Sequence, residues 1–384
     1  MDVLISIVGV ILGVFTGITP GVHVNTIIPL LNLDGRTLVL VLISASIAHT
    51  FLDAIPSTFI GIPDESTAVS LYPAHSMALE GRGIEAVAIA TFSGLISVIA
   101  LTPAFFILSK VKLNVSRLTL PVLLLVTIFL ITQERGDTFA GKYSRVVAVG
   151  KAFVVLAISG IVGFLALNFD TLSPLFSGLF AFPVLLGGIK RKTEIPEQKV
   201  CFKPRTLPAL LGSLSGTLTS IFPGISSGIA STIAVSPFKE RNSENYVSAT
   251  GAANTANALM CFAVLISSGK SRSGVAYAIS YFYEFLNPVD VFLICIFSAT
   301  LSAIIALIFA LFAGRILHRV NVRLLCSSAL IFVALTVVIE SIEKPVALIV
   351  FALSSLVGLL PEKLGVRRIN CMGSLLIPLI AFHV

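Results

Sequence analysis

Charged residues are scarce in this chain of 384 residues: Lys, Arg, Asp and Glu together make up 12% of it, about half of the roughly 25% found in soluble domains. Hydrophobic residues make up 56%, and the mean hydropathy is +1.02. A soluble core of this length cannot hide so much apolar surface from water. The composition therefore argues against a soluble enzyme, a DNA-binding module and a disordered chain.

Cysteine pairs and the common catalytic motifs are also absent. The five cysteines are scattered and form no CxxC pair, so we expect neither a disulfide framework nor a metal site. The chain has no P-loop, no HExxH, and no GxSxG followed by an acid and a histidine. We expect no cofactor and no catalysis, although a membrane enzyme built from dispersed residues stays open as an alternative.

Long apolar segments dominate what is present. A bilayer-spanning helix needs ~20 mostly apolar residues, and no basic region precedes the first segment, so we expect that segment to be kept rather than cleaved. We predict an all-α, polytopic protein of the cell membrane with roughly ten to thirteen embedded segments. The segments lie near 3–18, 38–60, 84–109, 118–132, 144–168, 172–189, 206–222, 247–267, 273–313, 322–340, 345–360 and 371–384.

The net charge of +7 is not taken as a sign of nucleic acid, because Lys and Arg accumulate in the cytoplasmic loops of membrane proteins. The stretch 190–205 is the most polar connector and carries a net charge of +4. We predict that it is a cytoplasmic linker between a first repeat, 1–189, and a second repeat, 206–384, which together form one membrane domain.

A comparison of the two halves supports this division. Residues 9–21 align without gaps onto 212–224, and the five identities are three glycines, one threonine and one proline. Further on, Asp53 aligns with Asn257. These matches predict a duplication, as in transporters built from repeats with broken helices. The basic clusters 110–117 and 315–323 also correspond. The positive-inside rule places both in the cytoplasm, whereas an inverted repeat places them on opposite sides.

Each half has a Pro-Gly pair inside an apolar stretch, where a helix should break. A new helix that starts after the break would expose free N–H groups, which form a natural anion site. A kinked helix with a satisfied histidine is the alternative. The predicted substrate-binding residues at the two breaks are Thr19, Pro20, Gly21, His23 and Asn25 in the first half, and Pro223, Gly224, Ser226 and Ser227 in the second.

Polar residues inside apolar helices form a second set of candidates. His49 and Asp53 lie one turn apart, and an ionisable residue in a membrane helix is by default a functional candidate. Asp53 would bind Na⁺ or carry a proton; a structural bond to His49 is the alternative. A polar patch after Pro63 adds two further carboxylates. The ion-coupling candidates are thus His49, Asp53, Asp64 and Glu65, and Asn254 and Asn257 join the substrate-binding candidates.

The paired Pro-Gly breaks and the patch after Pro63 resemble the large membrane subunit of tripartite tricarboxylate transporters, the TctA family. The matching residues are Pro20-Gly21, Tyr72-Pro73, Met77-Ala78, Gly81, Pro223-Gly224 and the run 251–257. The resemblance implies an inverted repeat with re-entrant helices, and partners that include a small membrane subunit and an extracytoplasmic binding protein. The chain departs from the pattern at His23 and Ser226, where the family has glycine, and at Ser70-Leu71, where it has Asp-Gly.

These observations together predict a secondary transporter that moves a small anionic substrate, a carboxylate, by alternating access. A related bacterial family with similar paired breaks is thought to move polyprenyl-phosphate lipid carriers, so a translocase of that kind is the alternative. The sequence predicts contact with the lipid bilayer and none with nucleic acid, and it leaves homo-oligomerisation open.

Overall fold

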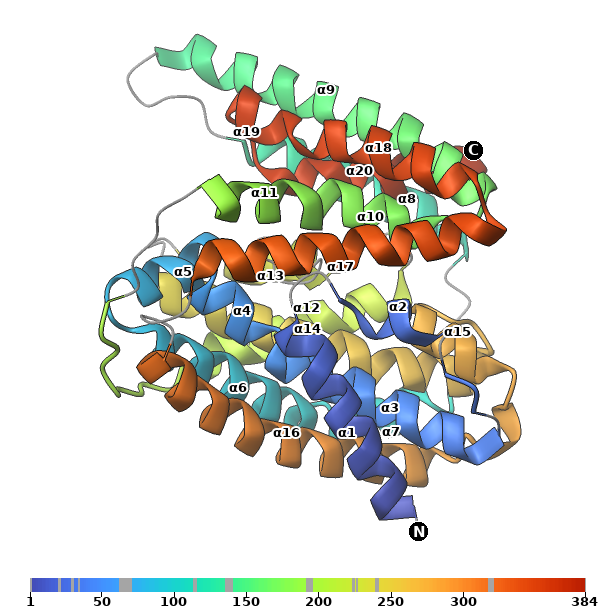
Figure 1. Cartoon of the computed structure of the whole chain (residues 1–384). Helices are drawn as coiled ribbons and strands as arrows, with labels where there is room; N and C mark the ends of the chain where they lie inside the picture. Colours follow the sequence, from blue (N-terminus) through green and yellow to red (C-terminus); the bar gives the residue numbers. More distant parts are fainter. Residues whose placement is uncertain are drawn as a thin grey trace. The chain divides into compact units, whose positions relative to one another are not determined.

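The computed structural model describes residues 2–19, 22–28, 31–33, 35–61, 71–112, 116–134, 141–190, 196–222, 225, 227–238, 242–316 and 321–383. Every regular element within these ranges is a helix (Figure 1). The chain forms two compact units. Unit 1 comprises Met1–Asn114, Arg191–Ile221 and Ser226–Leu325, and unit 2 comprises Val115–Lys190, Phe222–Ile225 and Cys326–Val384. Each unit therefore takes chain from both sides of the basic linker.

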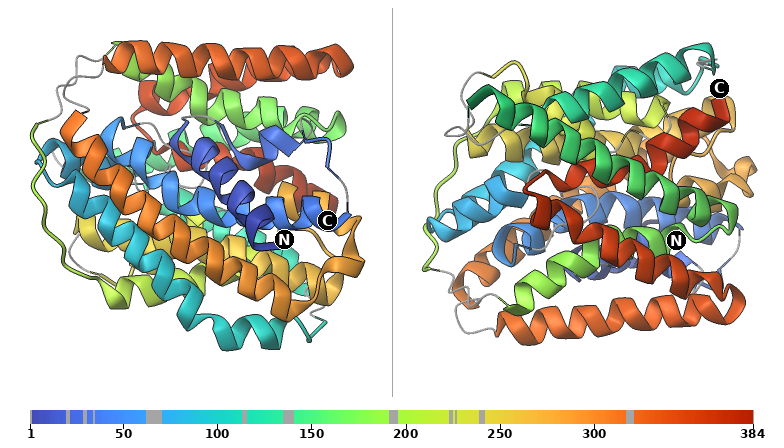
Figure 2. Two further views of the ribbon diagram at one scale, coloured as in Figure 1. Left: turned by 60° about the horizontal axis from the view of Figure 1, so that its bottom comes forward. Right: turned by 90° about the horizontal axis from the view of Figure 1, so that it is seen from above.

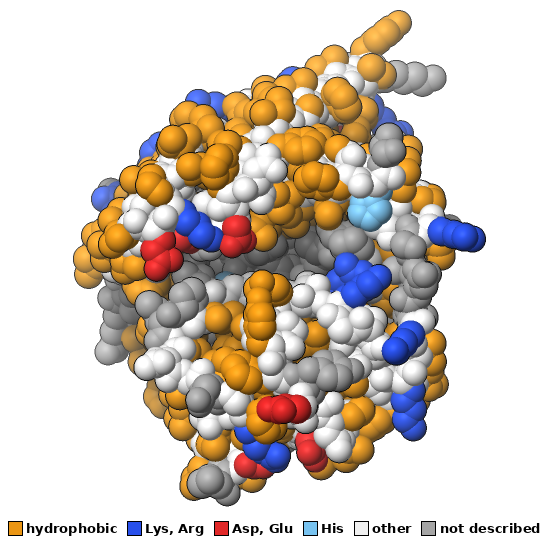
Figure 3. Space-filling view, turned by 90° about the vertical axis from the view of Figure 1, so that its right-hand side faces the viewer, with side chains coloured by type: hydrophobic (Ala, Val, Ile, Leu, Met, Phe, Trp, Pro, Cys, Tyr) orange, Lys and Arg blue, Asp and Glu red, His pale blue; other side chains and the backbone are white. Residues whose placement is uncertain are grey.

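The predicted all-α membrane class is confirmed. In the described part of the chain, 8 helices are long and apolar enough to cross a membrane, and the apolar helices Asp2–Ile18, Arg117–Thr132 and Arg368–His383 are shorter. Large apolar side chains such as Leu4, Ile11 and Leu214 are more than half exposed. Apolar side chains also cover much of the face in Figure 3, where charged ones occur singly or in small groups. This surface suits lipid rather than water.

Unit 1 contains the helices that carry the candidate site. They are α1 (Asp2–Ile18), α2 (Val24–Ile27), α3 (Gly35–Leu52), α4 (Ala54–Phe59), α5 (Leu71–Leu79), α6 (Gly83–Ala100), α7 (Thr102–Leu108), α12 (Thr206–Ile221), α13 (Ser227–Val235), α14 (Ser243–Ser268), α15 (Gly274–Ser280), the 3₁₀ turn η3 (Tyr283–Phe285) and α16 (Pro288–Ile316). Its apolar core includes residues of α3, α6, α14 and α16, and α16 lies alongside α6 (Figure 2).

Unit 2 is also built from helices. It contains α8 (Ser116–Thr132), α9 (Gly141–Asn168), α10 (Leu172–Phe176), η2 (Ser177–Ala181), α11 (Phe182–Lys190), most of α17 (Val322–Glu343), α18 (Val346–Gly358), α19 (Leu360–Leu364), η5 (Arg368–Met372) and α20 (Gly373–His383). Its buried carboxylate, Glu134, accepts hydrogen bonds from Arg367 at 3.2 Å and from Asn370 at 2.8 Å. A buried charge that is paired in this way stabilises packing and has no need of a ligand.

Helices α1 and α3 run in the same direction and pack closely because α1 presents glycines to α3. A methyl group on Gly9 would lie 2.5 Å from the carbonyl oxygen of Val41, and one on Gly13 would lie 2.4 Å from that of Ala45. Contacts that advance together along both helices mean that they are parallel. Helix α3 therefore begins at the same end of unit 1 as α1.

Helices α12 and α14 repeat this arrangement. A methyl group on Gly212 would lie 2.3 Å from the carbonyl oxygen of Ala249, and one on Gly216 would lie 2.5 Å from that of Ala253. These helices are again parallel, and α13 packs against both of them on the chain's return. The Asn242 side chain caps the start of α14, and Gly269 ends it at φ 65°. Cap and terminator explain the extent of this 26-residue helix.

The two pairs run in opposite directions. Asp53 and Thr50 of the first pair contact Asn254 and Thr255 of the second, so the contact moves backward on α14 as it moves forward on α3. Helix α6 gives the same result. It runs antiparallel to the segment formed by α3 and α4, since Gly83 lies against Phe59 of α4 and Gly94 against Phe51 of α3. It runs parallel to α14, since Ala90 lies against Gly251 and Gly94 against Thr255.

Candidate functional site

Asp53 lies at the joint between α3 and α4, where the two long helices α3 and α14 cross. Pro56 has no N–H to offer the carbonyl of residue 52, so the helix is interrupted just before α4 begins. The Asp53 side chain is 2% exposed. One of its oxygens accepts a hydrogen bond from the Asn254 amide at 2.7 Å. The structure thus brings together two candidates that the sequence placed in different halves.

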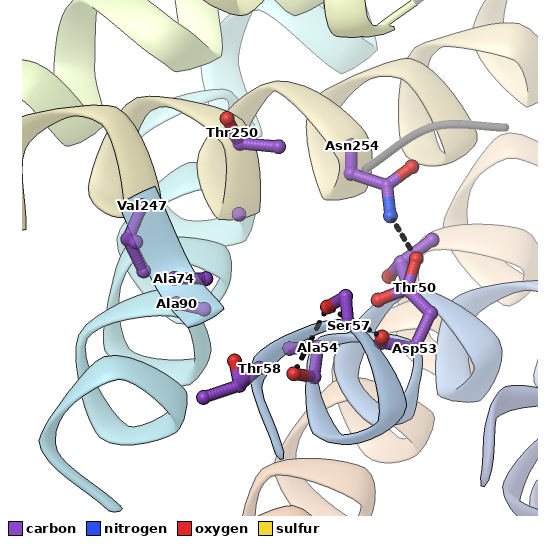
Figure 4. A pocket seen from close by; sticks show the side chains of 11 residues that line it. Thr50, Asp53, Ala54, Ser57, Thr58, Ala74, Ala90, Val247, Thr250 and Asn254 are labelled. Carbon is purple, nitrogen blue, oxygen red and sulfur yellow. Dashed lines mark hydrogen bonds between the residues drawn. The ribbon is translucent and has the colours of Figure 1, made fainter. Parts of the chain in front are cut away.

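A small cavity opens beside this hydrogen bond. Its volume of ≈ 20 Å³ leaves room for one or two water molecules or one small ion, and is far too small for a tricarboxylate. Thr250 and Asn254 of α14 lie on one side of it, and Asp53 and Ser57 on the opposite side (Figure 4). The full lining consists of Thr50, Asp53, Ala54, Ser57, Thr58, Ala74, Ala90, Val247, Thr250, Gly251 and Asn254.

The hydroxyl groups around the cavity are held mostly by their own helices. Thr50 Oγ1 donates to the carbonyl of Ile47 at 2.8 Å. Ser57 Oγ donates to the carbonyls of Asp53 and Ala54 at 2.9 and 3.0 Å. A hydroxyl whose proton is used in this way turns lone pairs outward. The Asp53 carboxylate and the Ser57 hydroxyl therefore present acceptors to the cavity, while the Asn254 amide and the Thr250 hydroxyl can also donate.

His49 and His23 form a second cluster near the end of α1. The His49 Nδ1 atom lies 3.1 Å from Thr16 Oγ1, and the His49 and His23 rings meet edge to face with their centroids 4.5 Å apart. His23 in turn caps α2, because its Nδ1 accepts a hydrogen bond from the Asn25 N–H at 3.1 Å. His23, Asn25 and His49 are thus connected, and the exposed Asn25 side chain lies against Gly274.

Asn257 occupies the matching place in the second helix pair. Its Oδ1 accepts a hydrogen bond from Thr219 at 2.6 Å, as His49 contacts Thr16 in the first pair. The alignment of the sequences instead paired Asn257 with Asp53, four residues after His49. The contacts therefore shift α14 by about one helical turn relative to that alignment.

In each helix pair, a salt bridge joins the beginnings of the two helices. The acidic residue is on the first helix in one pair and on the second helix in the other. Asp2 of α1 binds Arg36 of α3, whereas Arg205, just before α12, binds Glu244 of α14. The first pair is about half exposed, while the Glu244 side chain is 9% exposed. Glu244 also binds Arg82, which links it to α6 through Glu85 at 2.8 Å.

Several predicted site residues lie outside the described ranges: Pro20, Gly21, Asp64, Glu65, Pro223, Gly224 and Ser226. Of the remaining ones, Thr19 follows the last residue of α1, and its hydroxyl donates to the Phe15 carbonyl at 2.6 Å. Ser227 is the first residue of α13 and is buried. Within the described residues there is no group of three or more His, Cys, Asp or Glu that could hold a metal ion.

The sequence analysis missed the threonines that complete these clusters: Thr16, Thr219 and Thr250. Thr250 lies one turn before Asn254, so the spacing of i and i+4 on a polar-containing helix face could have found it. Thr16 and Thr219 were identities in the aligned repeat, but a threonine that follows two glycines gave no sign of its partner. Their partners, His49 and Asn257, become apparent only from the packing of α1 on α3 and of α12 on α14.

Comparisons with known proteins identify the family of this chain. The model of the tripartite tricarboxylate transporter TctA family matches residues 3–373. Over 403 aligned positions the chain is 29% identical to Uncharacterized protein MJ1079 of Methanocaldococcus jannaschii, with 100% of this chain and 99% of that protein covered. No solved structure matches. With a family match along nearly its whole length, this multi-pass membrane protein belongs to the tripartite tricarboxylate transporter TctA family.

Proposed function

We propose that the protein is a secondary transporter that moves a small carboxylate across the membrane by alternating access. The observation that carries the proposal is the meeting of the two opposed helix pairs. Thr16 contacts His49 and Thr219 contacts Asn257, and each threonine lies within five residues of a Pro-Gly pair. The Asp53–Asn254 hydrogen bond joins the two long helices at the same level.

The repeat is proposed to be inverted. Parallel helices within each pair, opposed directions between the pairs, and equivalent glycine contacts at a constant spacing all support this arrangement. The exchanged ion pairs Asp2–Arg36 and Arg205–Glu244 lie at equivalent places in the two halves. In transporters of this construction, the substrate binds between the broken helices near the middle of the bilayer.

The substrate is proposed to bind beside the breaks rather than in the cavity at Asp53, which is too small for it and contains a carboxylate that would repel an anion. Backbone N–H groups after Gly21 and Gly224 would hold a carboxylate. Side-chain donors would come from His23, Asn25 and Asn257, together with Ser226 and Ser227. Asp53 is proposed to couple transport to a cation, and the family's tripartite systems suggest a small membrane subunit and a binding protein as partners.

The test is uptake of radiolabelled citrate into proteoliposomes under an imposed ion gradient. We expect saturable uptake that collapses with the gradient, and loss of uptake in Gly21→Leu, whose side chain would block approach to the backbone. Gly187→Leu is the matched control, because Gly187 has open space around it. Vesicles that take up no citrate or other organic acid, but move a labelled polyprenyl phosphate between leaflets, would show a lipid translocase instead.

A further inference from the structure

We infer that Arg272, in the loop between α14 and α15, binds a carboxylate group of the transported anion, with the side-chain amides of Asn25 and Asn257 as neighbouring donors. The inference deepens the proposed function, because it adds a positive charge that the candidate residues at the two breaks do not supply. It rests on that function only in taking the anion to be transported, since binding of an anion at Arg272 can be measured without transport.

Arg272 is a half-buried cation that forms no ion pair with any residue that the structure describes. Its Nε atom is buried and has no hydrogen-bond partner within the same part of the chain. A buried donor without a partner is costly, and more so when the group is charged. Buried charges in proteins are therefore normally paired, and an anion that binds Arg272 would supply the missing partner.

Other partly buried arginines of this chain do have acidic partners. Arg82, Arg205 and Arg367 have side chains that are 34–35% exposed, and each of them binds a glutamate. At Arg272, burial lowers the pKa of the guanidinium, and Cys261 is the one described residue whose charge opposes this effect. A nearby carboxylate would raise that pKa, and a thiol is mostly neutral near pH 7. The described residues therefore place no fixed counter-charge beside Arg272.

The position of Arg272 connects it to candidate site residues from both halves of the chain. Gly274, two residues later, packs on the Asn25 side chain, since a methyl group on it would lie 2.6 Å from Asn25 Oδ1. Helix α15, which begins at Gly274, lies beside α2 (Figure 1). Cys261, whose charge acts on Arg272, lies 3.5 Å from Asn257 Oδ1 through its Sγ atom. The loop thus brings a cation into the neighbourhood of both amides, all within unit 1.

The groups around Arg272 suit a carboxylate. Asn257 Oδ1 already accepts from Thr219 at 2.6 Å, and the amide nitrogens of Asn25 and Asn257 donate to none of the described residues. A guanidinium can donate two parallel hydrogen bonds to the two oxygens of a carboxylate, and an ionised pair of this kind is stronger than a neutral one. The amides would add neutral donors to the same anion.

A lipid phosphate is the other source of an anion at this place. Tyr277 and Tyr281 of α15 are 57% and 70% exposed, and exposed tyrosines are enriched at the level of the lipid headgroups. The buried Nε atom of Arg272 and the nearby amides favour a small anion that enters the protein. The experiment must therefore compare a soluble carboxylate with an anionic lipid.

The experiment measures the melting temperature of the purified full-length protein in neutral detergent, titrated with citrate against chloride at constant ionic strength. We expect saturable stabilisation of the wild type, because a ligand of the folded state alone raises its stability. Arg272→Gln should weaken citrate affinity about 10- to 100-fold, since a charged hydrogen bond is lost. Arg272→Lys keeps the charge without the planar fork and should give an intermediate affinity.

The matched control is Lys270→Gln, which removes the same charge from an exposed position in the same loop and should leave citrate affinity unchanged. Without citrate, Arg272→Gln should melt no lower than the wild type, because it removes a buried charge that has no partner among the described residues. A lower melting temperature together with unchanged citrate affinity would show a structural role for Arg272 and overturn the inference.

Three further outcomes would overturn the inference. These are an equal loss of affinity in Lys270→Gln and Arg272→Gln, no stabilisation of the wild type by citrate, succinate or inorganic phosphate, and Arg272-dependent stabilisation by phosphatidylglycerol in phosphatidylcholine nanodiscs but not by citrate. Citrate binding that depends on Arg272, without citrate uptake into proteoliposomes, would leave the site standing and contradict the proposed transport. Uptake that is unchanged in Arg272→Gln would do the reverse.

Discussion

The helix pairs α1–α3 and α12–α14 have the same scaffold but different chemistry. Two glycines on the first helix meet backbone of the second helix in both, and a threonine one turn later contacts its polar residue. The polar residue is His49 in one pair and Asn257 in the other. Relative to these contacts, Asp53 in the first pair corresponds to Cys261 in the second.

This difference separates the packing that the two pairs share from the chemistry that only one of them has. The features held in common are small residues and hydrogen bonds, which any tight pair of helices in a membrane needs. The imidazole and the carboxylate occur in the first pair only, at the level where the pairs cross. Ionisable groups are costly in such places, so their presence in the first pair alone fits the proposed role of Asp53 in ion coupling.

The largest effect is expected from breaking the packing that the pairs share. Gly13→Leu and Gly216→Leu would each force a side chain into a backbone carbonyl that lies 2.4 or 2.5 Å from the added Cβ. We expect both variants to lose monodisperse protein in size-exclusion chromatography, at a cost above the roughly 1–3 kcal/mol of ordinary overpacking. Gly150→Leu, which meets nothing within 4 Å, is the control. Tolerance of one variant alone would mean that the pairs are not equivalent.

Next in size is the effect of neutralising the first pair. Asp53→Asn keeps the shape and some hydrogen bonding, so the protein should fold, but it cannot balance a cation. Citrate uptake should lose its dependence on the ion gradient, while Cys261→Ala, the matching change in the second pair, should keep it. Uptake in Asp53→Asn that still follows the gradient would move coupling to another residue, and Asp64 and Glu65 would be tested next.

The exchanged ion pairs should differ in strength. Arg205→Gln leaves the nearly buried Glu244 with Arg82 alone and should cost about 1–3 kcal/mol. Arg36→Gln breaks a pair that is about half exposed and should cost less than about 1 kcal/mol. Denaturation midpoints of the two variants, measured in the same detergent, check the order. Equal losses of stability in the two variants would show that the burial of Glu244 does not determine how strongly its ion pair stabilises the fold.

The smallest effect is expected from making the first pair resemble the second. His49→Asn retains a group that can hydrogen-bond Thr16, as Asn257 does with Thr219, so stability should change by less than about 1 kcal/mol. His49→Leu removes that group and should cost more. Thermal melts distinguish the two variants, and a larger loss for Asn than for Leu would disprove the correspondence of His49 with Asn257.

The sequence predicted the features that depend on composition and local pattern. Apolar length gave the membrane class, and the recurring glycines and prolines located α1 and α12. Asp53 stood out because a carboxylate in an apolar helix is rare. The sequence alignment did not predict the register of α14 against α12. Gly- and Ala-rich segments align almost equally well when shifted by four residues, so a difference of one helical turn between the halves could not be detected. Thr250 was missed because its importance depends on a neighbour from α3.

The central claim, two opposed helix pairs in one membrane protein, is tested most directly by topology. Single cysteines would replace Lys203, at the beginning of α12, and Arg36 and Lys270, at the end of unit 1 where α3 begins and α14 ends, in a background without the native cysteines. An impermeant thiol reagent would be applied to intact cells and to inverted vesicles. We expect position 203 to label from the cytoplasm, and 36 and 270 from the opposite side. Labelling of 203 and 36 from the same side would contradict the inverted arrangement and the site built upon it.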